Sequence, residues 1–461
     1  MPTTSQPIAD LSKSIAFAED HRFGDAELFF STTDRRGVIR QGNSVFVRIA
    51  GYSQAELVGA PHNIVRHPRM PAGVFALMWD RLEAGLPVCA YVRNQARDGA
   101  SYWVFATMSP LRSGYLSVRV APRAEAMGRI ERIYARAHAV EQRLCRAGVG
   151  RRDRAVAGRA EIEKALREDG FGSYDEFVLD ALPLEVAARD RLVSATYLRP
   201  QARGPIAEVL GGVAVLDRAL DRLVTRLADY RDLCDQLADA SAQLIDITER
   251  MNRSVAAAAA ASAPIAESHP VLANVAQVMR EPMDQAVVEL RELRTGLDRL
   301  RGSVADLRFR ISLAALYNDM VAAFAAEVVD GTAPPRSLDA VPALCEAAAS
   351  GLTEMSERVD TVNAQMRAVA ASTERAADAL DRFRRFLGQW RILVLRHRAR
   401  PLIGDRLEPI DAEIGVSWDW MELLYTLGRE FRSGAVVFDV EAVGRQLDGI
   451  ELAAAIVGIA G

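Results

Sequence analysis

The sequence predicts an α+β chain in which an N-terminal domain, a five-stranded antiparallel sheet with short helices, precedes a long all-α coiled-coil and hairpin region. Between residues 23 and 122, short apolar runs of period two alternate with turn signals, which is typical of antiparallel strands. Beyond residue 206, apolar residues recur in alternating steps of three and four over many turns, which is typical of coiled coils. These two periods define the fold class.

Composition excludes several kinds of protein. The 461 residues carry a net charge of −4, so no global basic field favours nucleic acid. The four cysteines have no metal-ligand spacing and are typical of a reduced, cytoplasmic protein; they are Cys89, Cys145, Cys234 and Cys345. No stretch of about 18 consecutive apolar residues and no signal peptide pattern occurs, so we expect no membrane insertion.

The elements of the N-terminal domain follow in order. Two strands are joined by a turn at 34–37, and helical patterning then continues from residue 43. Asp98-Gly99 is a strong hairpin signal between two longer strands. The predicted strands are 26–33, 38–42, 88–97, 101–111 and 114–120.

The segment at 51–71, GYSQAELVGAPHNIVRHPRMP, precedes a helix at 71–84 that places Phe75 and Trp79 on one face. This segment, with the later run YVRN…DG…YWV…GYLSVR, resembles the PAS domain of bacterial aerotaxis receptors, which binds FAD and senses redox state. The resemblance covers residues 25–122. It implies that flavin-contacting or pocket-shaping positions are Asn43, Arg66, His67, Phe75, Trp79 and Asn94.

Two departures from that family leave other ligands open. Arg69 replaces an acid, and Val88 replaces a tryptophan whose ring could stack on a ligand. The alternatives to FAD are haem, with His62 or His67 as the axial ligand, another small molecule, or an empty pocket. Phe75 and Trp79 would also pack the core of a domain without ligand.

The rest of the chain predicts helices. Residues 123–205 form a connector to which we assign no chemistry, and Ser173 caps one of its helices. The predicted boundaries are an arm at 1–22, the sensor at 23–122, the connector at 123–205, a coiled-coil helix at 206–256, a hinge at 257–271, an antiparallel hairpin at 272–396 with its turn near 330–337, and a helical segment at 397–461.

Residues 307–327, LRFRISLAALYNDMVAAFAAE, are similar to the stretch leading into the cytoplasmic hairpin tip of methyl-accepting chemotaxis receptors. That family docks its kinase and coupling protein through polar residues. This chain has Tyr317, Val321 and Phe324 at those positions, so we expect a buried or differently partnered end and not the usual kinase control.

No P-loop, GxSxG or HExxH motif is present, so we expect no enzyme. The sequence favours a sensory transducer in which the PAS pocket senses redox state, oxygen or a small ligand and signals to a chemoreceptor-like coiled coil. The alternative is a structural or partner-binding coiled-coil protein whose PAS domain has lost its ligand and acts as a dimerisation module. We expect a homodimer in either case, with chemotaxis signalling proteins as partners of the transducer.

Overall fold

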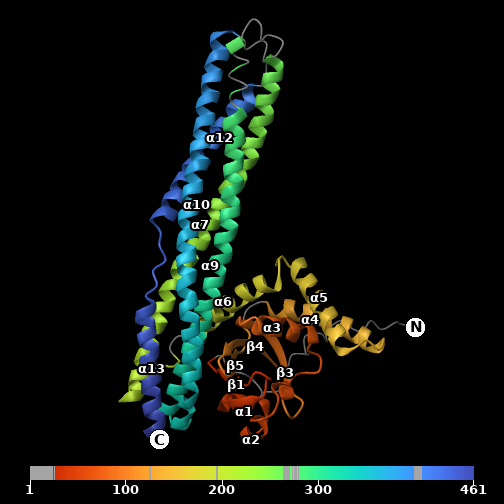
Figure 1. Cartoon of the computed structure of the whole chain (residues 1–461), viewed down its shortest axis with the longest axis vertical. Coiled ribbons are helices and arrows are strands. Elements are labelled where there is room, and N and C mark those ends of the chain that lie inside the picture. Colours follow the sequence, from red (N-terminus) through yellow and green to blue (C-terminus); the bar gives the residue numbers. More distant parts are fainter. Residues whose placement is uncertain are drawn as a thin grey trace, which may run out of the picture. The chain divides into compact units, whose positions relative to one another are not determined.

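The computed structural model describes residues 24, 26–123, 126–193, 196–262, 270, 271, 274, 278, 280–398 and 407–460 (Figure 1). An antiparallel sheet near the N-terminus is followed by long helices, as predicted. The chain divides into two compact units. The first comprises residues 1–221, 308–355 and 439–461, and the second comprises 222–307 and 356–438.

The sheet has the strand order β2-β1-β5-β4-β3, and all neighbours are antiparallel. The Asp98-Gly99 turn joins β3 to β4 as predicted, with Gly99 at a φ of 91° that glycine adopts without strain. The strands are β1 Phe29–Thr33, β2 Ile39–Gly42, β3 Val88–Gln95, β4 Ser101–Leu111 and β5 Gly114–Val120. Every predicted strand is present, with β1 beginning three residues later than expected.

Short helices between β2 and β3 cover one face of the sheet. They are α1 Ser44–Ala50, α2 Gln54–Leu57, the 3-10 helix η2 His62–Val65 and α3 Ala72–Glu83. Gly51 ends α1 in the left-handed conformation, and Ser53 with Glu56 forms a capping box that begins α2. These local signals fix the path of the chain before it reaches α3.

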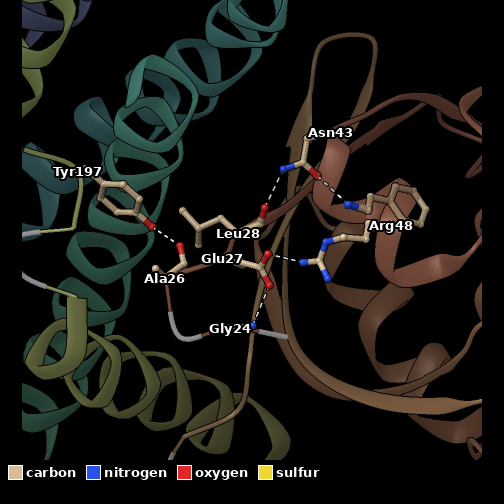
Figure 2. Close-up of polar contacts among 8 residues, drawn as sticks. Gly24, Ala26, Glu27, Leu28, Asn43, Arg48 and Tyr197 are labelled. Carbon is tan, nitrogen blue, oxygen red and sulfur yellow. Dashed lines mark hydrogen bonds and ion pairs between the residues drawn. The ribbon is translucent and has the colours of Figure 1, made fainter. Parts of the chain in front are cut away.

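Asn43 holds the start of β1 against α1 (Figure 2). Its side-chain oxygen accepts hydrogen bonds from the N–H groups of Phe46 and Phe30, each at 3.1 Å, and its amide nitrogen donates to the carbonyl of Leu28 at 2.7 Å. Nearby, Glu27 pairs with Arg48. The buried Asn43 side chain is therefore occupied in holding the fold together.

Three connector helices follow the sheet: α4 Met127–Arg146, α5 Arg151–Glu168 and α6 Tyr174–Val193. Gly148 and Gly170, both at positive φ, lie in the two breaks between them, and Ser173 Oγ accepts the N–H of Glu176 at 3.1 Å, as the predicted cap requires. Helices α3 and α5 pack backbone to backbone, because a Cβ atom on Gly73 would collide with the backbone nitrogen of Arg159. Helices α4 and α5 lie side by side next to α3 in Figure 1.

The other face of the sheet is also covered within the first unit. On β3, Tyr91 donates to Glu185 of α6 at 2.7 Å. On β1, the Phe30 ring meets the Phe324 ring edge-on with 5.4 Å between centroids, and Ser109 on β4 accepts a hydrogen bond from Tyr317. Phe324 and Tyr317 belong to helix α9, so the segment that resembles a receptor tip packs on the sheet.

The long helices are α7 Pro205–Ser262, α9 Arg280–Val329, α10 Val341–Arg396, α12 Leu407–Ser433 and α13 Val440–Ala460, with the 3-10 helix η4 Pro335–Ala340 between α9 and α10. Each predicted heptad position with a described side chain is buried, from Val213 to Thr248, from Met283 to Ile311 and from Leu352 to Trp390. Positions Met251 and Val255 and most of the predicted hinge at 257–271 lie outside the described side chains.

Helices α9 and α10 run antiparallel. In the first unit Arg310 pairs with Glu354, and in the second unit Arg358 pairs with Asp306 and Arg375 with Glu289. Within the second unit, the pair farther along α10 therefore involves an earlier residue of α9, which is the antiparallel arrangement.

In the second unit, other helices of the same chain cover this hairpin. Ser241 of α7 donates to the carbonyl of Leu290 on α9 at 3.3 Å, and Gly428 of α12 packs on Thr373 of α10. The prediction of a homodimer assumed that a second copy would cover these apolar flanks. Here α7 and α12 supply much of that cover.

Helix α9 has an 18-residue window apolar enough to cross a membrane by length and composition, but 78% of it is buried inside the fold. A core helix of a globular protein has the same properties.

Candidate functional site

A cavity of about 660 Å³ lies between the sheet and the short helices. This volume is within the range of pockets that bind small molecules and cofactors. Its wall is formed by the inward-facing residues of β1, β3, β4 and β5, by η2 and α3, and by the first turn of α5.

Helix α3 supplies the apolar side of the cavity. Phe75 and Trp79 are four residues apart, so they lie on the same face of the helix, and both line the cavity. The Trp79 ring meets Tyr115 of β5 edge-on at 5.3 Å between centroids, and the Arg66 guanidinium lies 4.1 Å from the centre of the Phe75 ring. Together these rings form an aromatic wall that can contact a flat ligand.

The opposite side presents two buried side chains that each keep a donor atom without an acceptor. Asn94 on β3 is 4% exposed and Arg119 on β5 is 5% exposed. Among the described residues, neither Nδ2 of Asn94 nor Nη1 of Arg119 forms a well-aligned hydrogen bond, although the Asn94 amide lies near the hydroxyl of its strand partner Tyr102. A buried donor without an acceptor costs about 1–3 kcal/mol, so a ligand that supplies acceptor atoms here gains that energy.

His62 is a hydrogen-bond acceptor in this wall. Its Nε2 lies 3.0 Å from Nη2 of Arg119, and a guanidinium can only donate, so the proton of the neutral ring is on Nδ1. Burial of the ring, reinforced by the nearby Arg119 charge, holds the pKa of His62 well below its usual value. Burial also lowers the pKa of Arg119 to about 10, so Arg119 stays charged at neutral pH.

Positive charge dominates the lining. No aspartate or glutamate of the described chain lines the cavity. Its five lining arginines are Arg36, Arg66, Arg119, Arg151 and Arg152. Burial, followed by the repulsion of Arg151, lowers the pKa of Arg66. Such a lining favours a ligand with negative charge or several acceptor atoms.

Arg151 and Arg152 were not foreseen, because they belong to a connector to which the sequence assigned no chemistry. They begin α5 directly after the Gly148–Gly150 break. The positive end of the helix dipole repels two arginines at the start of a helix. This unfavourable placement is the feature of the sequence that could have identified Arg151 and Arg152 as site residues.

The sequence-predicted site residues divide into two groups. Arg66, Phe75, Trp79 and Asn94 line the cavity, and Arg66 also donates to the carbonyl of Met70 at 2.9 Å. Asn43 and His67 are not part of the lining. Asn43 makes the structural bonds described above, and Nδ1 of His67 accepts the N–H of Arg69 at 3.1 Å, which shapes the loop before α3.

The two departures from the aerotaxis pattern also lie outside the cavity lining. Val88 is buried at the start of β3, paired with Met108 of β4, and the Arg69 side chain is exposed. Val88 nevertheless lies on the same face of β3 as Val92 and Asn94, and its partner Met108 lines the cavity, so the expected loss of a ring-stacking surface at position 88 stays a prediction.

Haem fits this cavity poorly. Nε2 of His62 is engaged by Arg119, and His67 is outside the lining with its Nδ1 bonded to the loop. A flavin fits better, because its ring combines apolar faces with edge acceptors that match the donors of Asn94 and Arg119.

The comparisons with known proteins agree with this fold. Residues 41–117 match the PAS fold family model. The chain is 40% identical over 115 residues to the aerotaxis receptor of Escherichia coli K12, a match that covers 24% of this chain and 23% of the receptor. It is 33% identical over 86 residues to the nitrogen fixation regulatory protein of Klebsiella pneumoniae, covering 19% of this chain and 17% of that protein.

Solved structures similar to part of this chain include a PAS domain from Colwellia psychrerythraea, at 20% identity and a TM-score of 0.18, covering 20% of this chain and 85% of that one. A second is the LOV protein of Rhodobacter sphaeroides, at 16% identity and a TM-score of 0.20, covering 32% and 88%. The chain spans about a quarter or less of the length of the curated relatives described above. The N-terminal part of this chain is therefore a PAS domain homologous to part of the aerotaxis receptor.

Proposed function

We propose that this chain is a sensory signal-transduction protein whose PAS cavity binds a flavin, FAD in the first instance, and reports the state of that flavin to the helices. The observation that carries the proposal is the pair of buried, unpaired donors on Asn94 and Arg119 in a cavity of about 660 Å³ without acidic residues. The similarity to the aerotaxis receptor supports the same ligand class.

A bound flavin supplies two redox states that differ in charge and in the protons on the ring. The residues of the cavity can distinguish these states through their donors. Arg119 stays positively charged and favours an anionic ring edge, while Nδ2 of Asn94 donates only to an atom that lacks a proton. A ligand changes a conformational equilibrium only through such differential contacts.

The route from the cavity to the helices begins at α3, which carries Phe75 and Trp79 on one side and packs against α5 on the other. A second route crosses the sheet, because the strands of the cavity wall contact α6 and α9 on their outer face. Either route can bias the packing of the long helices.

The output is proposed to be of the aerotaxis or energy-taxis type, with a homodimer and chemotaxis signalling proteins as partners. Tyr317, Val321 and Phe324 are buried in the first unit, so we place the partner surface elsewhere than at these residues. Sedimentation of the purified chain measures the dimer, and a monomer at all concentrations would contradict it.

No observation favours the competing hypothesis of a ligand-free dimerisation module. The outer face of the sheet is covered by α6 and α9 in the described part of the chain. A second copy would have to displace these helices to pair through that face.

The test is an ultraviolet–visible absorbance spectrum of the protein purified without added cofactor, followed by titration of the stripped protein with FAD. Flavin bands, or saturable FAD binding, are expected. A Soret band would show that the bound cofactor is haem and would overturn the flavin proposal. A featureless spectrum with no FAD binding would also overturn it.

A further inference from the structure

We propose that helix α5 is part of the ligand site, and that Arg151 and Arg152 hold an anionic group of the ligand, such as a phosphate, at the mouth of the PAS cavity. This inference rests on the proposed flavin-type ligand and adds a role for the connector. The ligand would then contact the PAS domain and the first output helices at once.

The position of the two arginines is the first observation. Both line the cavity together with Arg66, and the charge of Arg151 acts on Arg66 closely enough to lower the Arg66 pKa. Among the described residues, the side chains of Arg151 and Arg152 form no ion pair or hydrogen bond, and both are exposed. Three like charges around one opening repel each other, and a bound anion removes that cost.

The start of α5 adds to this field. Gly150 is the N-cap residue and provides no side-chain cap, so N–H groups of the first turn remain available as donors. The helix dipole makes the same end positive. A phosphate placed here meets backbone donors, the dipole and two guanidinium groups.

A second observation points independently to a ligand in the same cavity. Asn94 and Arg119 are buried deep in the wall and keep unpaired donors, as described above. These donors suit the acceptor edge of a planar head group. The cavity thus has a deep donor end and an outer cationic end, which suits a planar ligand with an anionic tail.

Helix α5 is held firmly enough to form a site wall. Gly73 of α3 and Gly158 of α5 lie in direct backbone contact, and Arg159 pairs with Asp80 of α3. Glu141 of α4 bonds the first N–H groups of α3. A ligand anion bound to Arg151 and Arg152 would add one more contact between α3 and the α4–α5 pair. Dissociation of the ligand would remove that contact.

The experiment compares two flavins that differ only by a phosphate. The full chain, stripped of cofactor, is titrated with riboflavin and with FMN, and each dissociation constant is measured by flavin fluorescence. For the wild-type chain we expect FMN to bind about tenfold or more tightly than riboflavin, because charge-assisted bonds to phosphate are strong. This preference should shrink as salt is raised.

The test variant is Arg151→Ala/Arg152→Ala, which should lose the preference for FMN while binding riboflavin as the wild type does. The matched control is Arg143→Ala/Arg146→Ala, which removes two exposed arginines from the last turn of α4 that do not line the cavity, and it should keep the preference. Hydrogen exchange gives a second readout, since FMN should slow exchange across 127–168 in the wild type and the control but not in the test variant.

The outcomes separate the two proposals. If the wild-type chain binds none of riboflavin, FMN and FAD, the proposed function fails and this inference fails with it. If flavins bind but the ratio of FMN to riboflavin affinity is the same in the wild type and in Arg151→Ala/Arg152→Ala, only the role of α5 is overturned. A loss of riboflavin binding in the test variant would also count against it, because the planar head should not depend on these arginines.

Discussion

Glu141 of α4 accepts a hydrogen bond from the backbone N–H of Gly73 at 2.9 Å, although the two residues are 68 positions apart in the chain. Its second oxygen accepts the N–H of Ala72 at 2.8 Å. Helix α3 begins after Pro71, which has no side-chain cap, so a connector residue performs the capping that the local sequence lacks. The carboxylate also complements the positive end of the α3 dipole.

Replacing Glu141 by alanine should therefore destabilise the first unit by about 1–2 kcal/mol, as the loss of a helix cap does. The buried N–H groups of Ala72 and Gly73 would lose their acceptor, and exchange should rise first in α3 and α4. Denaturant unfolding and hydrogen exchange measure these effects. Glu131→Ala removes an exposed acid from the same helix and should have little effect; equal losses in the two variants would contradict the capping role.

Asn94→Ala should lower the affinity for FAD about tenfold, which corresponds to one lost hydrogen bond to the ligand. The apo protein should keep its stability, because Nδ2 of Asn94 forms no well-aligned hydrogen bond within the described protein. Flavin fluorescence measures the affinity. Gln95→Ala changes the next residue of β3, which is outside the cavity lining, and serves as the control. An Asn94→Ala protein that retained FAD fully would refute this assignment.

The lowered pKa of His62 predicts that the stability of the fold depends on pH. Its pKa is well below the usual value in the folded chain, so the folded state binds fewer protons than the unfolded state as pH falls below about 6.5. The contribution of His62 is present above that pH and is lost as pH falls toward the folded pKa.

The difference in unfolding free energy between the wild type and His62→Gln should therefore grow as pH rises from about 5 to 7.5. The glutamine can still accept a hydrogen bond from Arg119 but does not titrate in this range. Urea unfolding of both proteins at several pH values measures the difference. A difference that does not change with pH would show that His62 keeps its usual pKa.

Phe324→Ala should destabilise the first unit by about 3–5 kcal/mol, the range for removing a buried phenylalanine ring. The ring packs edge-on against Phe30 of the sheet and is almost completely buried. Leu198→Ala removes a side chain that is 63% exposed and should change stability by about 0.5 kcal/mol or less. Similar stabilities for the Phe324→Ala variant and the wild type would indicate that this segment faces solvent, as a kinase-docking tip does.

The periodic patterns of the sequence determined the elements of this chain. Alternation of period two and the Asp98-Gly99 turn defined the strands, and the heptads from Val213 to Thr248 and from Leu352 to Trp390 defined which faces of α7 and α10 are buried. These features are local, because strand and helix periods follow from backbone geometry. The helical spacing of Phe75 and Trp79 likewise placed both on the cavity side of α3.

Tertiary structure decided what the site contains. Asn43 and His67 carry the right chemistry, but hydrogen bonds within the fold engage them away from the cavity, whereas Arg119, Arg151 and Arg152 reach it from β5 and α5. It also decided that Phe324 packs on the sheet and that Glu141 caps α3. Residues far apart in the chain make these contacts, and no local period records which distant surfaces meet when the chain buries its apolar faces.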